Sequence, residues 1–216
     1  MSKIVAIDGP AGSGKGTVAE ILSEKCNLIN IDTGATYRCV ALAALNNNLT
    51  LDNVDEIVEL SGKIKIEFTP DKRVLLDNKD VTDAIRSKEV TSIVSPISSI
   101  LKVRENMVKL QREMAKNYDV VMEGRDITTV VLPNANYKFY LDATLEERAN
   151  RRYKQYQEKG IDMTLEEIKE NISKRDYNDM HKEVGSLIRT DEQVYIDSTN
   201  MTIEEVVNKM IEVIEE

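Results

Sequence analysis

Five short apolar segments constrain the fold of this chain more than any other feature. They are KIVAID (3–8), LINID (28–32), DVVME (119–123), YKFYLD (137–142) and QVYID (193–197). Most are nearly continuous in apolar character, which is typical of strands buried on both faces. Segments with helical periodicity lie between them. Alternation of this kind predicts an α/β fold with a central parallel sheet flanked by helices.

Three of the expected helices have a readable start. A threonine followed three residues later by a glutamate matches the capping box, in which the two residues satisfy each other's backbone N–H groups. The matches are TLEE (144–147), TLEE (164–167) and TIEE (202–205). The last helix has a single apolar stripe, which predicts a face that docks on the core. Its members are Ile203, Val206, Val207, Met210, Ile211 and Ile214.

Two stretches interrupt the alternation of strands and helices. Residues 64–82 alternate apolar and polar side chains and then turn at TPDK, which predicts a small antiparallel unit outside the main sheet. Residues 145–182 are highly charged and mostly helical, with a break near Gly160. We therefore expect one domain over residues 1–216, with an insert at about 62–97 and a helical segment at about 145–183.

Composition excludes several classes of protein. The chain has 29 Lys and Arg against 38 Asp and Glu, a formal charge of -9, which disfavours general binding to nucleic acids or anionic membranes. It has no apolar run of about 18 residues that could span a bilayer, and no signal-peptide pattern at its N-terminus. The two cysteines, Cys26 and Cys39, fit a reduced cytoplasmic protein. A single histidine, His181, excludes a multi-histidine metal site.

The segment GPAGSGKGT (9–17) directly follows the first expected strand and opens a helix. In this context glycines let backbone N–H groups turn inward around phosphates, while the helix N-terminus and a lysine supply positive charge. The sequence therefore predicts a loop that binds the triphosphate of ATP. Its residues are Gly9, Pro10, Ala11, Gly12, Ser13, Gly14, Lys15, Gly16 and Thr17.

This phosphate loop departs from the usual motif after its lysine. A serine or threonine normally follows and reaches the magnesium, but here Gly16 follows and the hydroxyl comes one place later, at Thr17. Magnesium readily keeps several waters, so we expect Mg²⁺ to bind with ATP through phosphates and water, without a protein metal site. Thr17 can then donate to a phosphate oxygen. The ending GKGT resembles nucleoside monophosphate kinases, whose acceptor is itself a phosphate.

Three further stretches narrow the acceptor. DTGATYR (32–38) and EGRDITTVVLP (123–133) each follow an expected strand, where ligands of open parallel sheets bind, and KRDYNDMHK (174–182) lies in the second interruption. Together with the phosphate loop, and in this order, they resemble the bacterial cytidylate kinases with an enlarged acceptor-binding insert. The resemblance runs essentially from end to end and implies a P-loop kinase that phosphorylates CMP, and dCMP, with ATP.

The resemblance also implies roles for individual residues. Those that hold the monophosphate or its sugar are Thr33, Tyr37, Arg38 and Arg125, and those that read the cytosine are Ser95, Arg104 and Asp126. Contacts to the pentose and phosphate come from Arg175 and Asp179, with Lys182 at a third position of the same motif. Residues 145–183 become the lid, whose arginines reach the transferring phosphates beside Lys15 and Arg125. They are Arg148, Arg151 and Arg152.

The chemistry of these residue types agrees with that assignment. The Asp126 carboxylate can accept from the exocyclic amino group of cytosine, and Arg104 can donate to the ring acceptors. Uracil carries a carbonyl oxygen where cytosine has the amino group, so we expect CMP to be preferred over UMP. A nucleoside monophosphate has a second pKa near 6 and is already nucleophilic at neutral pH. Catalysis therefore requires alignment and positive charge instead of a general base.

Three departures from the family pattern stand out. Lys182 replaces an arginine and cannot make a bidentate contact to phosphate. Thr128 replaces a glycine directly after GRDI, where a side chain could disturb the loop that carries Asp126. GSL at 185–187 replaces a Pro-Leu pair near the end of the lid.

Several alternatives stay open. The lid arginines could pair with neighbouring glutamates on a solvated face, Arg175 and Asp179 could form an ordinary i, i+4 pair, and Tyr37 could be core packing. A P-loop kinase of a small hydroxylated metabolite would use Asp126 as a general base. A P-loop switch would require a hydroxyl directly after Lys15 and a guanine-reading motif, which the sequence lacks. We expect a cytoplasmic monomer whose partners are ATP and CMP or dCMP.

Overall fold

The computed structural model describes residues 2–69, 71–116 and 118–215. These residues fall into two units, each with its own core. We call residues 3–28 with 121–215 the sheet unit and residues 29–120 the insert unit.

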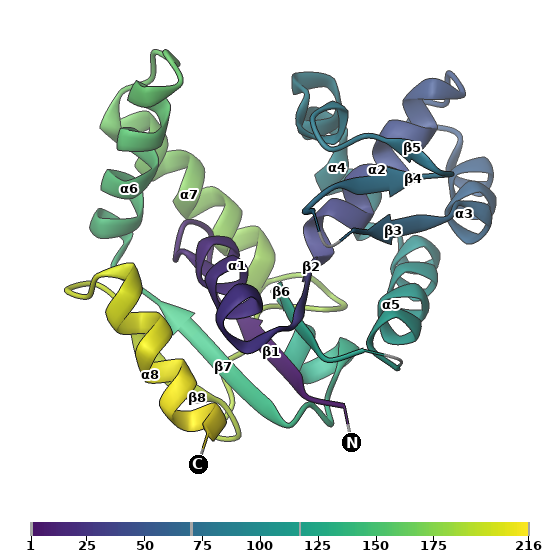
Figure 1. Ribbon diagram of the computed structural model, residues 1–216. Coiled ribbons are helices and arrows are strands. Elements are labelled where there is room, and N and C mark those ends of the chain that lie inside the picture. Colours follow the sequence, from purple (N-terminus) through teal and green to yellow (C-terminus); the bar gives the residue numbers. More distant parts are fainter. Residues whose placement is uncertain (1, 70, 117, 216) are drawn as a thin grey trace. The chain divides into compact units, whose positions relative to one another are not determined.

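The sheet unit contains the parallel strands that the apolar segments predicted. Strands β6 (Val120–Gly124), β1 (Ile4–Asp8), β7 (Tyr137–Asp142) and β8 (Val194–Asp197) lie side by side in that order (Figure 1). β1 pairs in parallel with β7, so that Asp8 lies opposite Tyr140, and β7 pairs in parallel with β8. The predicted α/β class is confirmed.

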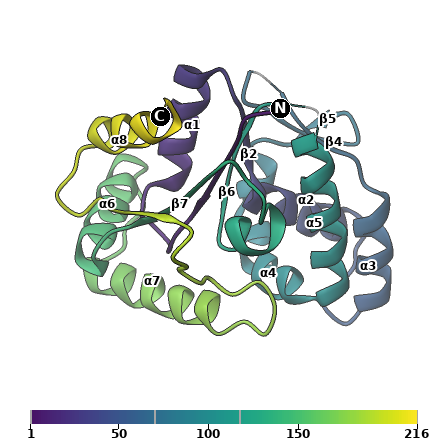
Figure 2. The same ribbon diagram turned by 90° about the horizontal axis from the view of Figure 1, so that it is seen from below.

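Helices α1 (Lys15–Cys26) and α8 (Ile203–Glu215) lie beside each other (Figure 2). Their inner faces form one apolar core with β1 and β7, in which Val18 and Leu22 pack with Val206 and Met210. The predicted docking stripe of α8 is buried at Val206, Val207, Met210 and Ile214. The prediction was wrong at Ile203, which is 49% exposed. Ile203 is the first residue of α8 and lies before the turn that reaches the core.

The lid segment folds as two helices, α6 (Leu145–Glu158) and α7 (Leu165–Met180), which contact each other. The break predicted near Gly160 is present, and that glycine has φ 64. Thr164 and Glu167 form the predicted capping box at the start of α7, and Thr202 and Glu205 do the same before α8. The box predicted at 144–147 forms only in part, because the N–H of Thr144 donates to Thr199 Oγ1 (3.0 Å) instead of to Glu147. A small core joins the hairpin to the phosphate loop: Ala149, Ile168 and Ile172 pack with Ala11.

The insert unit begins with β2 (Ile29–Asp32), α2 (Thr33–Asn46) and α3 (Val54–Lys63). The predicted antiparallel sheet follows as β3 (Ile66–Phe68), β4 (Val74–Leu76) and β5 (Lys79–Asp80). A short turn, η1 (Ala84–Arg86), then leads to α4 (Lys88–Ser99) and α5 (Leu101–Lys116). Ile66, Val74 and Leu76 share one core with Ile57 of α3 and Met107 of α5. The small sheet therefore packs within a larger unit than the insert expected at 62–97.

Within the described part of the chain, no helix combines the length and the apolar character that crossing a bilayer requires.

Candidate active site

The phosphate loop links β1 to α1 through backbone conformations that require glycine. Gly14 has φ 96 at the N-cap of α1 and Gly9 has φ 154, both in the region that side chains avoid. A Cβ on Gly9 would lie 2.0 Å from the carbonyl oxygen of Leu141, so no other residue fits there. This geometry places the loop backbone in close contact with β7, and α1 then begins at Lys15. It is the strand–loop–helix context that the sequence predicted.

Lys15 is the main cation of the loop. Its side chain is buried, and its Nζ donates to the carbonyl oxygen of Pro10 (2.9 Å) and to Ser13 Oγ (3.4 Å). Burial, followed by the nearby charge of Arg125, lowers the pKa of Lys15 to about 7, although Glu123 acts in the opposite direction. A phosphate anion at this position would restore the charged form, because an opposite charge raises the pKa of an ammonium group.

Arg148 is buried beneath the loop. Its Nε donates to the carbonyl oxygen of Ala143 (2.9 Å), its Nη1 donates to that of Ala11 (2.8 Å), and it forms an ion pair with Asp176. Asp176 in turn accepts from the backbone N–H of Ala11 (2.9 Å). We call this arrangement the Arg148–Asp176 clamp. It fixes both backbone groups of Ala11 and joins α6, α7 and the phosphate loop. Sequence reasoning singled out Arg148 but missed Asp176.

The other two lid arginines differ in their contacts. Arg151 pairs with Glu147 (Nε to Oε1, 2.9 Å), as the surface-pair alternative predicted, but it also donates to the carbonyl oxygen of Ser198 (2.6 Å). Arg152 is half-buried, and its guanidinium carbon lies 5.8 Å from the centre of the Tyr156 ring. Arg151 therefore links α6 to the segment after β8.

Three predicted acceptor residues of the sheet unit come together around the carboxylate of a fourth. Asp179 is buried, and its oxygens lie 2.7 Å from Arg125 Nε, 3.1 Å from Lys182 Nζ and 3.9 Å from Arg175 Nε. Burial alone would raise the pKa of Asp179, but the charges of Arg125 and Lys182 outweigh it and lower the pKa. Three cations share the Asp179 carboxylate, with Glu123 and Asp176 also acting on Arg125, and a group of cations of this kind suits a phosphate. Arg125 makes a closer pair with Asp179 than the i, i+4 partner Arg175 does.

Asp126 lies between this cluster and a tight turn. It is buried, and its carbonyl oxygen accepts from the backbone N–H groups of Val130 (2.8 Å) and Val131 (3.1 Å), the second of which is the i to i+5 bond of the π-turn η2 (Ile127–Val131). The side chain of Thr128, at the departure from the family pattern, points into the interior and is buried.

In the insert unit, Tyr37 and Arg104 lie together. Both are buried, and the guanidinium carbon of Arg104 lies 5.7 Å from the centre of the Tyr37 ring. Arg38 donates to Thr91 Oγ1 (2.9 Å) and to the carbonyl oxygen of Ile85 (3.2 Å). Tyr37 therefore combines core packing with a contact to a predicted base-reading residue.

The remaining predicted residues of this unit lie on α2 and α4. Thr33 is the first residue of α2, and its carbonyl oxygen accepts from Thr36 Oγ1 (2.7 Å). Gln111, which sequence reasoning missed, reaches the same hydroxyl with its Nε2 (2.8 Å) and supports the start of α2. Ser95 is exposed on α4, directly before Pro96.

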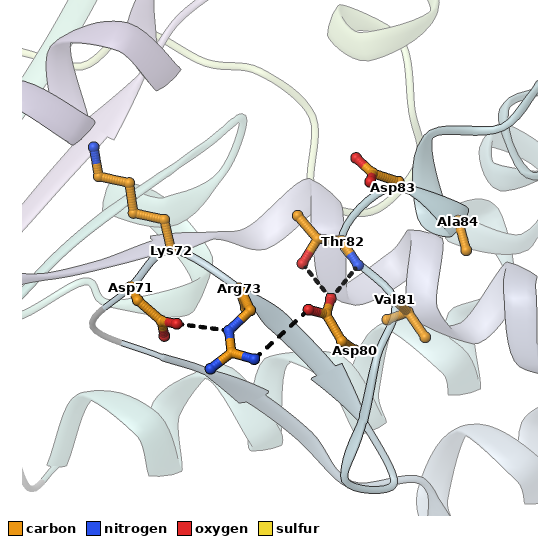
Figure 3. A pocket seen from close by; sticks show the side chains of 8 residues that line it. All are labelled: Asp71, Lys72, Arg73, Asp80, Val81, Thr82, Asp83 and Ala84. Atoms are coloured by element: carbon orange, nitrogen blue, oxygen red, sulfur yellow. Dashed lines mark hydrogen bonds and ion pairs between the residues drawn. The ribbon is translucent and has the colours of Figure 1, made fainter.

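A pocket of about 540 Å³ opens beside the turn between β3 and β4 (Figure 3). Three of its charged groups pair with one another: Arg73 contacts Asp71 (Nε to Oδ2, 2.6 Å) and Asp80 (Nη1 to Oδ2, 3.9 Å). Thr82 Oγ1 also donates to Asp80 (2.7 Å). None of the eight residues that line this pocket is a predicted site residue. We therefore do not assign it a role in phosphate transfer.

Residues 2–69, 71–116 and 118–215 contain no cluster of three or more His, Cys, Asp or Glu side chains that could hold a metal ion.

The parallel sheet and the glycine-rich turn before buried Lys15 define a P-loop phosphotransferase. Solved structures share this fold. The chain aligns with an uncharacterised protein from Eubacterium ventriosum (TM-score 0.56, 13% identity, 100% and 99% of the two chains). It also aligns with TT1252 from Thermus thermophilus (TM-score 0.53, 17% identity, 99% and 96%). A third match is shikimate kinase from Bacteroides thetaiotaomicron (TM-score 0.50, 13% identity, 99% of both chains). At these identities the likeness concerns the fold alone.

Sequence similarity identifies the family. The cytidylate kinase family model matches residues 5–216. Curated cytidylate kinases are similar over nearly their whole length. That of Leuconostoc mesenteroides is 45% identical (98% of this chain and 96% of the relative), and that of Clostridium tetani is 45% identical (100% and 95%). That of Caldicellulosiruptor saccharolyticus is 44% identical (98% and 96%). The chain belongs to the cytidylate kinase family.

Proposed function

We infer that this protein transfers the γ-phosphate of ATP to cytidine monophosphate and releases CDP and ADP, with dCMP as a second acceptor. The observation that carries this proposal is the match to the cytidylate kinase family over residues 5–216. The cation cluster around Asp179 supports it, because a phosphate acceptor needs fixed positive charge near the phosphate loop.

The triphosphate of ATP binds the loop from Gly9 to Thr17. Backbone N–H groups and the start of α1 receive the phosphates, and Lys15 neutralises the charge that develops during transfer. Because Lys15 is already buried and its pKa is lowered, it has little hydration to lose when the phosphate arrives.

Magnesium enters with ATP. The residues near the end of the loop fit this ion, because the exposed Thr17 carries a hydroxyl and Glu123 Oε1 lies 3.6 Å from the position of a Cβ on Gly16. Such oxygen atoms can accept hydrogen bonds from the waters of a Mg²⁺ ion that the phosphates hold. When bound, the ion supplies charge neutralisation and orients the β- and γ-phosphates.

The proposed acceptor residues divide into those for the monophosphate and those for the base. The monophosphate binds Arg125, Arg175 and Lys182, which Asp179 orients, together with Arg38. The cytosine binds Arg104, Asp126 and Ser95, while Thr33 and Tyr37 complete the site. Because Asp126 accepts from the amino group of cytosine, it disfavours UMP.

Among the lid arginines, Arg152 is the one that contacts the transferring phosphoryl group. Arg148 donates to Ala11 and Ala143, and Arg151 donates to Ser198, so their guanidinium groups are engaged with the protein. Arg148 therefore acts as a positioning residue that holds the loop, and Arg151 secures the start of the lid.

The reaction is an in-line attack of a phosphate oxygen on the γ-phosphorus. The CMP dianion needs no general base, so the protein contributes alignment, positive charge and exclusion of water. Closure of the lid prevents transfer of the phosphoryl group to water.

Initial rates with CMP, dCMP, UMP, AMP and GMP, at fixed ATP and magnesium, test this function. We expect CMP and dCMP to be the best acceptors and UMP to be weaker. Rapid ADP formation with a hydroxylated metabolite, without CDP formation from CMP, would instead support the alternative in which Asp126 is a general base.

We further propose that the protein is a cytoplasmic monomer that binds neither nucleic acids nor membranes, in keeping with its net charge of -9. Light scattering of the purified protein, with and without substrates, tests the monomer. A dimer at micromolar concentration would contradict this proposal.

A further inference from the structure

Thr128, which departs from the glycine of the family pattern, makes two side-chain hydrogen bonds inside the sheet unit. The residue is only 4% exposed. Its hydroxyl donates to Asp8 Oδ2 (2.6 Å) and accepts from Nε2 of Gln193. A hydroxyl carries one hydrogen and two lone pairs, so the donated bond fixes its orientation and leaves a lone pair for Gln193. The side chain is thus accommodated by specific partners.

Asp8 connects this hydroxyl to the phosphate loop. It is the last residue of β1, directly before Gly9, and it is fully buried. Its carboxylate also accepts from the backbone N–H groups of Ile127 and Thr128, both at 2.8 Å. Burial raises the pKa of Asp8, whereas the hydrogen bonds from Thr128 and Ile127 oppose that rise. Asp8 therefore fixes two consecutive amides directly after Asp126.

Gln193 extends the arrangement to the segment before β8. It is buried, its Oε1 accepts from the N–H of Thr190 (2.7 Å), and its Nε2 also lies 3.4 Å from the carbonyl oxygen of Ile188. Thr128 consequently joins three segments that are distant in sequence: the end of β1, the turn after β6 and the approach to β8.

We propose that Asp8, Thr128 and Gln193 form a hydrogen-bonded bracket that positions Arg125 and Asp126 for the acceptor nucleotide. This rests on the proposed acceptor roles of those two residues. β6 fixes the chain up to Gly124, and the bracket fixes it from Ile127 onward, so the backbone of Arg125 and Asp126 is held from both sides. Thr128 is a positioning residue, since it acts through its neighbours. Small displacements of positioning groups cost large factors in rate or affinity.

The test compares Thr128→Val with Thr128→Ser. Valine keeps the shape but removes the hydroxyl, which leaves Gln193 Nε2 and Asp8 each without one partner. Serine keeps the hydroxyl and loses only a methyl group. We expect Thr128→Val to raise the KM of CMP by roughly tenfold, as expected for a lost buried hydrogen bond, with the KM of ATP changed by less than about twofold. Thr128→Ser should stay within about twofold of the wild type for both substrates.

A double mutant tests the connection to Gln193. If Gln193 acts on the acceptor through the Thr128 hydroxyl, Gln193→Leu should raise the KM of CMP in the wild type but have no further effect in Thr128→Val. Equal CMP KM values for the valine and serine variants would overturn the proposal. So would a parallel rise in the KM values of CMP and ATP, because the hydroxyl would then act on the phosphate loop through Asp8 as much as on Arg125 and Asp126.

The experiments distinguish a failure of the proposed function from a failure of the proposed bracket. The wild-type acceptor panel decides which nucleotide is the substrate, whereas the Thr128→Val comparison is run with whichever acceptor the wild type uses. An acceptor KM that depends on the hydroxyl therefore supports the bracket even if the preferred base is not cytosine.

Discussion

Replacement of Arg148 by methionine tests whether Arg148 holds the phosphate loop in place or acts on the transferring phosphate. Methionine keeps an unbranched chain but removes all five guanidinium N–H donors. In the structure, two of those donors contact the carbonyl oxygens of Ala143 and Ala11, and the charge pairs with Asp176. Both side chains of the pair are about nine-tenths buried, at 9% and 10% exposed.

The expected cost follows from this burial. Removal of one partner of a buried ion pair typically costs about 3–5 kcal/mol, because the remaining charge is left uncompensated. For a chain of this size, each kcal/mol lowers Tm by roughly 2–4 °C. Arg148→Met should therefore lower Tm by at least about 6 °C. It should also raise the KM of ATP, because Ala11 loses the donor to its carbonyl oxygen.

Calorimetry and steady-state kinetics check this result, with Arg152→Met as the matched control. Arg152 is outside the clamp, so its replacement should change stability by less than about 0.5 kcal/mol. It should lower kcat by roughly 100-fold or more, as expected for an arginine that stabilises transferring phosphate charge. In addition, Arg148→Met/Asp176→Asn should recover part of the lost Tm, because no buried charge is left alone. A wild-type Tm for Arg148→Met, combined with a large fall in kcat, would refute the clamp.

Three other predictions concern single residues of the site. Lys15→Met should lower kcat much more than it raises the KM of CMP. It should also raise the Tm of the ligand-free protein at pH 7, because the pKa of Lys15 is lowered from 10.5 to about 7 and charging it opposes folding. That gain in Tm should shrink as the pH rises toward 10.5, since the unfolded lysine then loses its proton too; a constant gain would contradict the lowered pKa. Asp126→Asn should narrow the CMP-over-UMP ratio of kcat/KM, because an amide can donate as well as accept, and an unchanged ratio would remove Asp126 from the base site. Lys182→Ala should raise the KM of CMP, and unaltered kinetics would mean that Arg125 and Arg175 hold the phosphate without it.

The elements that the sequence predicted well are those with a local signal. The strands of the sheet unit were found within two residues of their observed bounds, because burial on both faces produces continuous apolar runs. The small antiparallel sheet was found from its alternation and its turn. Capping boxes marked the starts of α7 and α8 because their hydrogen bonds join residues only three positions apart.

The contacts that sequence reasoning missed join distant residues. Arg148 could be placed on a helix, but its partners Ala11 and Asp176 come from two other segments, so the choice between a phosphate contact and the clamp could not be made. The side chain of Thr128 could only be noted as a departure, because Gln193 lies 65 residues away in sequence. The sequence also did not show how far the insert unit extends, because α2, α3 and α5 share a core whose members are distant in sequence.

Packing of Ala11 against Ala149, Ile168 and Ile172 has a consequence for how the α6–α7 hairpin moves. The base of the hairpin shares its apolar interior with the phosphate loop, so it cannot swing away without exposing that interior to water. Tyr156 and Met163, on either side of Gly160, pack against the same interior. Displacement of the hairpin therefore carries a cost in apolar burial that the phosphate loop shares, and substitutions in this interior should affect both.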